Sequence, residues 1–464
     1  MKRDTDWLIF GSGLSALVLA ERLGNKGKEV VLINPSRSWG GIFGGIGING
    51  EIYDAGMTNF EFDLFGEPAD DLDHYSPDRK ADVGRYVHFV KSYLSRFVQT
   101  APLPTPRMCF GAELVDDLII SNRFDVVHTL SAEVKQKICA ELEDILARPN
   151  PLHPRTKNEP GSPLASTPFE QVSRANHGIT FHDLFIEPIF GKILGIPTRE
   201  IEGVFHRNGW APLFYPESLL SQFTATPQSL KPTIFRYPAD PHFGAFIARI
   251  ASAVQALPSV TVIEGAKEVV VDAATSMLRV GERSFSYNRL AWGADPGQLL
   301  GPDGVLRAPG RRASLDLFFL SVKAEGLAHR FAVLIDPETA SPFYRITDQS
   351  VCAGEQGPEH KIILECNSNN WDEQSPQRNQ RWEAALRRYG IDPAAVLSCE
   401  KRSFNGALCI PSHAQMEQFN QRRERIAQTF SQVTLIGAAS GYVSVTLNDH
   451  IIQALKIANQ EGAL

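Results

Sequence analysis

The stretch Asp6-Trp-Leu-Ile-Phe10, Gly11-Ser-Gly13-Leu-Ser-Ala16, Leu17-Val-Leu-Ala-Glu-Arg-Leu23 decides the fold. Its apolar start predicts a buried strand, and the apolar spacing after the glycines predicts a helix that ends at Gly24. Lys28-Glu-Val-Val-Leu-Ile-Asn34 then predicts a second strand. Together these segments predict a β-α-β unit of the size expected for a parallel crossover.

The turn between the first strand and the helix fits the pattern G-x-G-x-x-[G/A], with strand and helix on the required sides. Gly11 permits the tight turn, Gly13 lets the backbone approach a pyrophosphate, and Ala16 allows close helix–sheet packing. The helix start, with Leu14 and Ser15, offers free N–H groups to phosphates. The alternative is a turn that binds nothing, which the second strand at the right distance argues against.

The acidic residue expected at the end of the second strand is replaced by Asn34. An acid there would hold the ribose hydroxyls of a dinucleotide. An amide can also hydrogen-bond a hydroxyl, so we expect Asn34 to contact the cofactor.

Two glycine motifs follow, Ser38-Trp39-Gly40-Gly41 and Tyr53-Asp54-Ala55-Gly56. The order resembles the FAD-binding start of the flavoprotein superfamily that includes flavin amine oxidases, protoporphyrinogen oxidases, carotenoid desaturases and UDP-galactopyranose mutases. The resemblance implies that FAD is the cofactor and that Gly40 and Gly41 lie against its phosphate and ribityl region.

Two distant segments are also similar to that superfamily. Phe235-Arg-Tyr-Pro238 through Gly244-Ala-Phe246 leads into a helix and then to Val269, whose strand is implied to meet the adenine. At the other end, the resemblance implies that Gly437, Tyr442 and Val443 face the isoalloxazine ring. The chain departs from the pattern at Ala438, where many members have an acid, and at Asp240-Pro241-His242, where a second glycine is usual.

We therefore expect an α/β fold, with a Rossmann-like (glutathione-reductase-type) FAD-binding domain and an inserted second α+β substrate domain. Strands near both ends read as buried and parallel, so they need one common sheet. The expected cofactor domain is discontinuous, with residues 1–85, 233–300 and 403–464. The substrate domain is expected over residues 86–232 and 301–402.

The resemblance implies a FAD-dependent oxidoreductase that oxidises a small organic substrate by hydride transfer to flavin N5. Flavin chemistry needs little from side chains, and the sequence identifies no catalytic acid or base. We expect the substrate to contact Trp210, Arg236, Tyr344 and Arg345. Convergence of the two arginines would suit an anionic substrate.

Two alternatives remain open. A UDP-sugar mutase-like enzyme would use reduced FAD without net redox change, although the arginine expected in the mutase ending after Gly437 is absent. A non-enzymatic protein like the GDP-dissociation inhibitors would share the architecture and bind no flavin. Asn34 and Ala438 keep that second alternative open, and the intact glycine turn argues against it.

The composition excludes other classes of function. The 464 residues carry a net charge of −7, which argues against nucleic-acid binding. No apolar run reaches the roughly 18 residues of a membrane span, and the first residues do not read as a signal peptide. Six dispersed cysteines without C-x-x-C and twelve histidines without metal spacing predict no metal site and a cytoplasmic location. The sequence predicts no oligomeric state.

Overall fold

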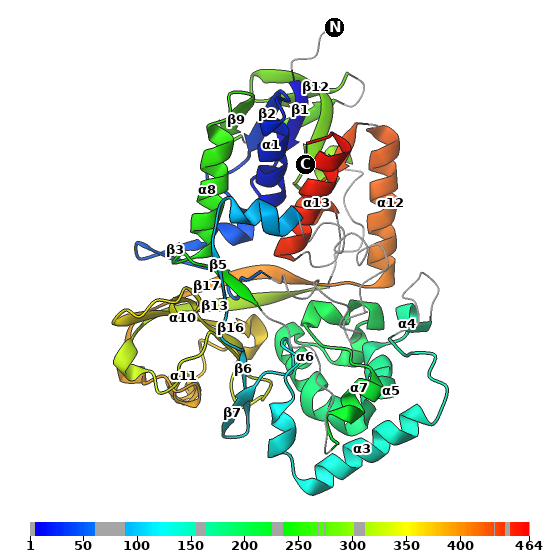
Figure 1. The fold of residues 1–464 in the computed structure, drawn as a ribbon, viewed down its shortest axis with the longest axis vertical. Helices are drawn as coiled ribbons and strands as arrows, with labels where there is room; N and C mark the ends of the chain where they lie inside the picture. Colours follow the sequence, from blue (N-terminus) through cyan, green and yellow to red (C-terminus); the bar gives the residue numbers. More distant parts are fainter. Residues whose placement is uncertain are drawn as a thin grey trace.

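A computed structural model of the chain describes residues 5–60, 89–154, 163–224, 235–266, 269–272, 275–300, 311–430, 432–440 and 446–463, apart from the side chains of 164–165 and 207–209. Two seven-stranded sheets dominate these residues. Figure 1 shows the first sheet with its helices at the top and the second sheet below it, beside a group of helices.

The first sheet confirms the predicted β-α-β unit. β1 (Thr5–Phe10) lies parallel to β2 (Val30–Asn34), and α1 (Leu14–Asn25) connects them. The sheet order is β10-β11-β12-β1-β2-β9, and β18 pairs with β12. The added strands are β9 (Val260–Glu264), β10 (Val269–Asp272), β11 (Met277–Val280), β12 (Arg283–Trp292) and β18 (Val433–Leu435). β18 is parallel to β12, so the predicted return of the last unit to this sheet is confirmed.

Side-chain alternation along β1 divides the core of this region into two layers. Trp7 and Ile9 belong to the same apolar cluster as residues of α1, α8 (Phe243–Gln255) and α13 (Leu447–Gln460). Leu8 and Phe10 belong to another cluster, with Ile426 of α12 (His413–Thr429). A strand that is apolar on both faces is therefore covered on both sides, as parallel sheets require.

The second sheet has the order β17-β13-β16-β15-β14-β6-β7 and is antiparallel except between β14 and β6. Its strands are β6 (Arg107–Phe110), β7 (Glu113–Asp116), β13 (Arg311–Lys323), β14 (Val333–Ile335), β15 (Phe343–Asp348), β16 (Glu359–Asn367) and β17 (Val396–Ile410). β17 belongs to this sheet over its whole length, so the domain boundary expected at residue 403 falls inside a strand.

The helices beside the second sheet are α3 (Ala132–Leu146), α4 (Pro163–Ser166), α5 (Phe169–Phe181), α6 (Glu187–Leu194) and α7 (Pro216–Ser221). Ser131 caps α3, because its side chain accepts a hydrogen bond from the N–H of Val134. One π-helical turn, His182–Ile186, joins α5 to α6. Shorter elements are β3 (Ile46–Ile48), β4 (Glu51–Tyr53), β5 (Thr100–Pro102), β8 (Arg236–Pro238), α9 (Gly297–Leu300), α10 (Gln349–Cys352) and α11 (Arg378–Arg388).

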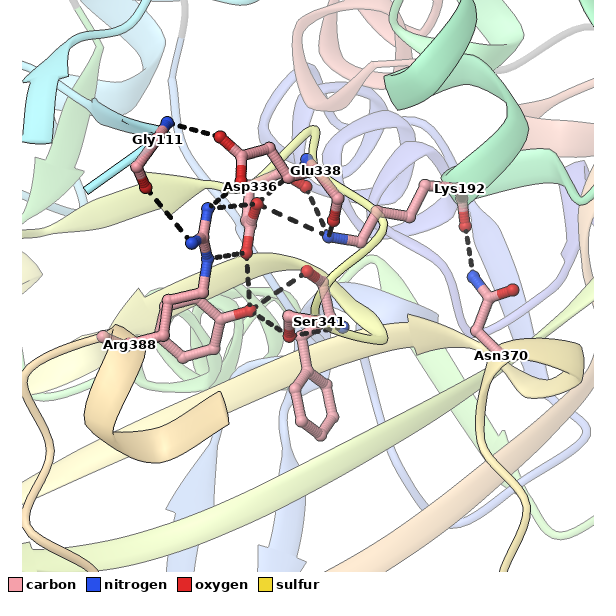
Figure 2. A network of polar contacts seen from close by, with 9 residues as sticks. Gly111, Lys192, Asp336, Glu338, Ser341, Asn370 and Arg388 are labelled. Atoms are coloured by element: carbon pink, nitrogen blue, oxygen red, sulfur yellow. Dashed lines mark hydrogen bonds and ion pairs between the residues drawn. The ribbon is translucent and has the colours of Figure 1, made fainter. Parts of the chain in front are cut away.

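A buried charge network joins α6 to the second sheet and α11 (Figure 2). Lys192 donates to the backbone oxygens of Asp336 (2.8 Å) and Glu338 (2.5 Å). Arg388 of α11 donates to the Asp336 carboxylate at 2.8 Å, and the hydroxyl of Tyr389 donates to it at 3.0 Å. Arg388 also pairs with the Glu338 carboxylate at 2.9 Å, so two cations and two carboxylates satisfy one another where α6, the second sheet and α11 meet.

Among the described residues, no helix is long and apolar enough to cross a membrane. In the same part of the chain, no group of three or more His, Cys, Asp or Glu side chains is arranged to hold a metal ion.

Candidate cofactor and substrate site

The glycine turn after β1 brings two backbones close together. Gly11 has φ of +147°, and a Cβ there would lie 3.4 Å from Cα of Gly293, just after β12. The N–H of Gly11 donates to the backbone oxygen of Ile33, and the N–H of Gly293 donates to the backbone oxygen of Phe10. Gly11 therefore allows the ends of β1, β2 and β12 to meet, in addition to permitting the turn.

Open space lies at the start of α1. A Cβ on Gly13 would meet no described atom within 4 Å, and the same holds for Gly41. Gly13 is the N-cap of α1, and no side chain caps that helix in the described chain. The N–H of Gly40 (φ +89°) donates to the backbone oxygen of Ser12 at 2.7 Å, so the paired glycine lies against the first glycine turn. An uncapped helix start facing open space can receive a phosphate group.

Ser15 ties the first turn of α1 to the last helix. Its hydroxyl donates to the backbone oxygen of His450 at 2.9 Å, so its oxygen accepts from Nδ1–H of the same histidine at 3.0 Å. Burial lowers the pKa of His450 to about 4, which keeps the imidazole neutral. Gly437 (φ +62°) lies beside this pair, since a Cβ there would be 3.5 Å from His450 Nδ1. The start of α1 and the segment at Gly437 therefore meet at one place, and Leu14 in the same turn of α1 is buried.

Asn34 is fully buried at the end of β2. Its Oδ1 accepts from the N–H (2.9 Å) and the hydroxyl of Ser36, and its Nδ2 donates to the backbone oxygen of Ser38 at 3.1 Å. The N–H of Gly265 donates to the backbone oxygen of Asn34, which joins this turn to the segment that leads into β10. Val269 begins β10, paired with Val280. Tyr442 and Val443 lie outside the described residues.

Asp54 explains why the Tyr53-to-Gly56 motif contains an acid. One carboxylate oxygen accepts from the N–H of Phe243 at 2.9 Å, at the start of α8, and the other accepts from the hydroxyl of Tyr237. Its backbone N–H donates to Gln349 at 2.7 Å, in α10 beside the second sheet. Burial raises the pKa of Asp54 to about 6, although both hydrogen bonds oppose that rise. One side chain thus joins the second glycine motif to the Phe235–Gly244 segment.

The structure brings three of the four predicted substrate residues together. The ring centroids of Trp210 and Tyr344 are 5.7 Å apart, and the guanidinium carbon of Arg345 lies 4.2 Å from the Trp210 centroid. Trp210 has φ of +54°, which is uncommon for a residue with a side chain. Strain of this kind persists only where the surroundings enforce it, and it often marks functional sites.

Glu365 completes this group, and the sequence analysis missed it. Its carboxylate accepts from Arg345 Nε at 2.5 Å and from a second guanidinium nitrogen at 2.7 Å, and it lies 3.3 Å from the Tyr344 hydroxyl. The N–H of Met57 also donates to it at 3.2 Å. The only signal was one acid within the apolar run Ile362-Ile-Leu-Glu365-Cys366. Because Met57 follows Gly56, the cluster lies next to the second glycine motif.

Arg236 has a different position. Its guanidinium donates to the hydroxyl (2.9 Å) and the backbone oxygen (2.8 Å) of Thr100, across the β5–β8 ladder. No contact described in the structure joins it to Trp210, Tyr344 or Arg345. The two arginines therefore do not form a shared anion clamp among the described contacts.

No family model and no curated protein matches the chain. Solved structures match over nearly its whole length. Reduced UDP-galactopyranose mutase matches with a TM-score of 0.72 at 17% identity, covering 98% of this chain and 93% of the other. A protein described as a protoporphyrinogen oxidase from Exiguobacterium sp. gives 0.65 at 12%, covering 99% of both chains. Cyclohexylamine oxidase from Brevibacterium oxydans gives 0.60 at 14%, covering 99% and 100%.

The chain therefore has the fold shared by these oxidases and the mutase. The predicted fold class, with a parallel β-α-β sheet and a second, mostly antiparallel sheet, is confirmed. Identities of 12–17% do not transfer a substrate or a reaction.

Proposed function

We propose that the chain is a FAD-dependent oxidoreductase that oxidises a small organic substrate beside the second glycine motif. One observation supports this most strongly: Gly13 and Gly41 leave open space at an uncapped helix start, where the glycine turn after β1, the Gly40–Gly41 pair and the segment at Gly437 meet. The residues present fit a dinucleotide, because N–H groups and glycine backbone face the space that its phosphates would need. FAD, when bound, would accept the hydride.

The chain's own residues would bind and orient the reactants. Gly11, Gly13, Leu14 and Ser15 would hold the pyrophosphate, with Gly40 and Gly41 alongside. Asn34 would shape the turn after β2 beside the cofactor. The strand that begins at Val269 would meet the adenine. Gly437 would face the ring system. Trp210, Tyr344 and Arg345 would contact the substrate, and Arg236 remains a further candidate.

The domain organisation is part of this proposal. The residues of the first sheet and its helices would form the cofactor domain, from three separate parts of the chain. The second sheet and the helices beside it would form the substrate domain. Because β17 runs to Ile410 within the second sheet, the last boundary belongs after that residue.

The first test is the cofactor itself. Denaturing the purified protein and chromatographing the supernatant should release FAD. Gly13→Val should abolish binding, because its side chain would enter the pyrophosphate space. Gly357→Val is the matched control, since Gly357 is exposed in the connection between α10 and β16. A colourless protein that takes up no added FAD would contradict the proposal and favour a binding protein.

The second test separates oxidation from sugar-ring isomerisation. Under anaerobic conditions, a substrate that the protein oxidises should bleach the flavin without any added reductant. Turnover of a nucleotide sugar only after dithionite reduction, with no net electron transfer, would overturn the oxidase proposal in favour of the mutase alternative.

A further inference from the structure

Three buried histidines are linked to the turn that carries Trp210, two directly and one through Ser173. His177 belongs to α5, His182 to the π-helical turn after it, and His206 to the segment just before Trp210. All three side chains are buried. The sequence showed no metal spacing for them, and the proposed flavin chemistry does not use them.

Two of these histidines hold the backbone on the C-terminal side of Trp210. His206 Nδ1 donates to the backbone oxygen of Ala211 at 2.6 Å. The N–H of Phe214 donates to His177 Nε2 at 2.8 Å. The backbone immediately after Trp210 is therefore fixed at two points by ring nitrogens, next to a residue with φ of +54°. This arrangement explains how an uncommon backbone conformation is maintained.

A series of hydrogen bonds runs from the N–H of Phe214 through His177 and Ser173 to His182. The N–H at its start determines which group donates at each step. Because a backbone N–H can only donate, His177 Nε2 must be the unprotonated nitrogen, so Nδ1 carries the proton. Nδ1–H then donates to Ser173 Oγ at 2.9 Å, and the Ser173 hydroxyl donates to His182 Nδ1 at 2.8 Å. The remaining His182 nitrogen faces Thr198 (3.3 Å) and Glu187 (3.5 Å). His177 and Ser173 thus each accept one hydrogen bond and donate one, and His182 Nδ1 accepts one.

The helices around these hydrogen-bonded groups are irregular. Gly178 breaks α5 with φ of +78°, and Glu141 of α3 binds the freed N–H and the hydroxyl of Thr180 at 2.8 and 2.7 Å. The π-helical turn that begins at His182 follows directly. Single π-turns occur frequently at functional sites.

We propose that His177, His182 and His206 form an acid-sensitive clamp that positions Trp210 over Arg345. The inference rests on the proposed function in that Trp210 contacts the substrate. A proton added to His177 must go to Nε2, which faces the N–H of Phe214. Two donors would then oppose each other in a buried place, and the turn would be released.

The groups that face the clamp favour its neutral form. Burial lowers the pKa of His177 well below its ordinary range, and the nearby rings of His182 and His206 lower it further. Burial also lowers the pKa of His182, with Arg174 acting in the same direction and Glu187, Asp183 and Glu170 opposing it. His206 stacks on Phe169, at 5.2 Å between centroids. The clamp is therefore intact at neutral pH and opens only in acid.

The test measures the fluorescence emission of Trp210. For each protein, the spectrum of the same protein carrying Trp210→Phe is subtracted. In the wild-type sequence this emission should stay constant near neutral pH and shift to the red in acid, before the far-UV signal of unfolding. His177→Phe should show the red shift already at neutral pH. His177→Gln, whose carbonyl can accept from Phe214, should restore the wild-type emission there and suppress the acid shift.

His360→Gln is the matched control, because His360 is buried but paired with Asp348 at 2.7 Å in the second sheet. It should leave Trp210 emission unchanged. An unchanged emission in folded His177→Phe would overturn the clamp, as would a wild-type emission that moves only with global unfolding. The measurement needs no flavin, so failure of FAD binding would count against the proposed function and not against the clamp.

Discussion

Two arginine–carboxylate pairs with buried carboxylates, Arg388–Asp336 and Arg345–Glu365, show how differently the same chemistry can be used. Asp336 accepts from Arg388, from Tyr389 and from the N–H of Glu338, and Lys192 lies 3.6 Å away. Arg388 also contacts the Glu338 carboxylate and the backbone oxygen of Gly111 (Figure 2). Each charge there has several partners, and no residue of the group has a strained backbone in the described structure.

Arg345 has fewer partners than Arg388, although Glu365 itself accepts four hydrogen bonds. Among the described contacts, Arg345 donates hydrogen bonds only to Glu365, and an indole ring covers its guanidinium. That ring belongs to Trp210, with its left-handed backbone. A network in which every charge has several partners stabilises the junction of the elements that it joins. Arg345, which has donors without a described acceptor and lies beside a strained aromatic residue, can still bind a ligand. The comparison therefore indicates a structural role for the first pair and supports the proposed binding role of Arg345 in the second.

The largest expected effect comes from the saturated network. Asp336→Ala should leave Lys192 and Arg388 with too few negative partners, and breaking a buried pair in this way costs about 3–5 kcal/mol. Urea unfolding should show the loss, while the FAD content of the folded fraction stays unchanged. Glu383→Ala, which breaks an exposed pair with Arg387 on α11, is the control and should cost at most about 1 kcal/mol. Equal losses in both variants would contradict the structural role.

Substitutions at the second pair should change binding. Arg345→Ala should weaken substrate capture about tenfold or more, because a charge-assisted contact is worth roughly 1.5–3 kcal/mol. Glu365→Gln should strengthen the capture of an anion, since it leaves the arginine charge uncompensated. Substrate-driven flavin reduction under anaerobic conditions measures both. Arg236→Gln should have less effect than Arg345→Ala, because Thr100 already engages Arg236. Unchanged apparent affinity in Arg345→Ala would remove Arg345 from the site.

A third prediction concerns Lys192. Burial lowers its pKa to about 8 from the ordinary 10.5, although Asp336 opposes the shift. Between these values the unfolded chain binds more protons than the folded one, so this group makes stability rise as the pH increases from about 8 to 10.5. Lys192→Met should remove that part of the rise. Urea midpoints measured across this range for both proteins provide the check, and identical slopes would show that Lys192 does not titrate as described.

The sequence predicted those parts of the molecule that local patterns determine. The β1-α1-β2 unit, its glycine turn and the return of β18 all follow from short segments with a clear period. Glu365 and His450 were missed because their partners, Arg345 and Ser15, are brought to them only by the fold. The role of Asp54 was missed for the same reason, since Phe243 and Gln349 are distant in sequence. Residue 403, where we expected a domain boundary, lies inside β17, because that strand is long and its polar residues resemble a connection.

The smallest effect is expected at Asp54, which belongs to neither arginine pair but joins the cofactor motifs to the second sheet. Burial raises its pKa to about 6 from the ordinary 3.8, so the folded chain binds more protons than the unfolded one between these values. Its contribution to stability therefore falls as the pH rises from about 4 to 6. Asp54→Asn should abolish this fall, because an amide does not titrate. It keeps an oxygen for the N–H of Phe243 but replaces the acceptor of the Tyr237 hydroxyl with a donor, which should cost about 1 kcal/mol at neutral pH. Thermal midpoints from pH 4 to 7 measure both effects, with Tyr237→Phe as the matched control. If Asp54→Asn kept the wild-type pH dependence, the titrating group would have to lie elsewhere.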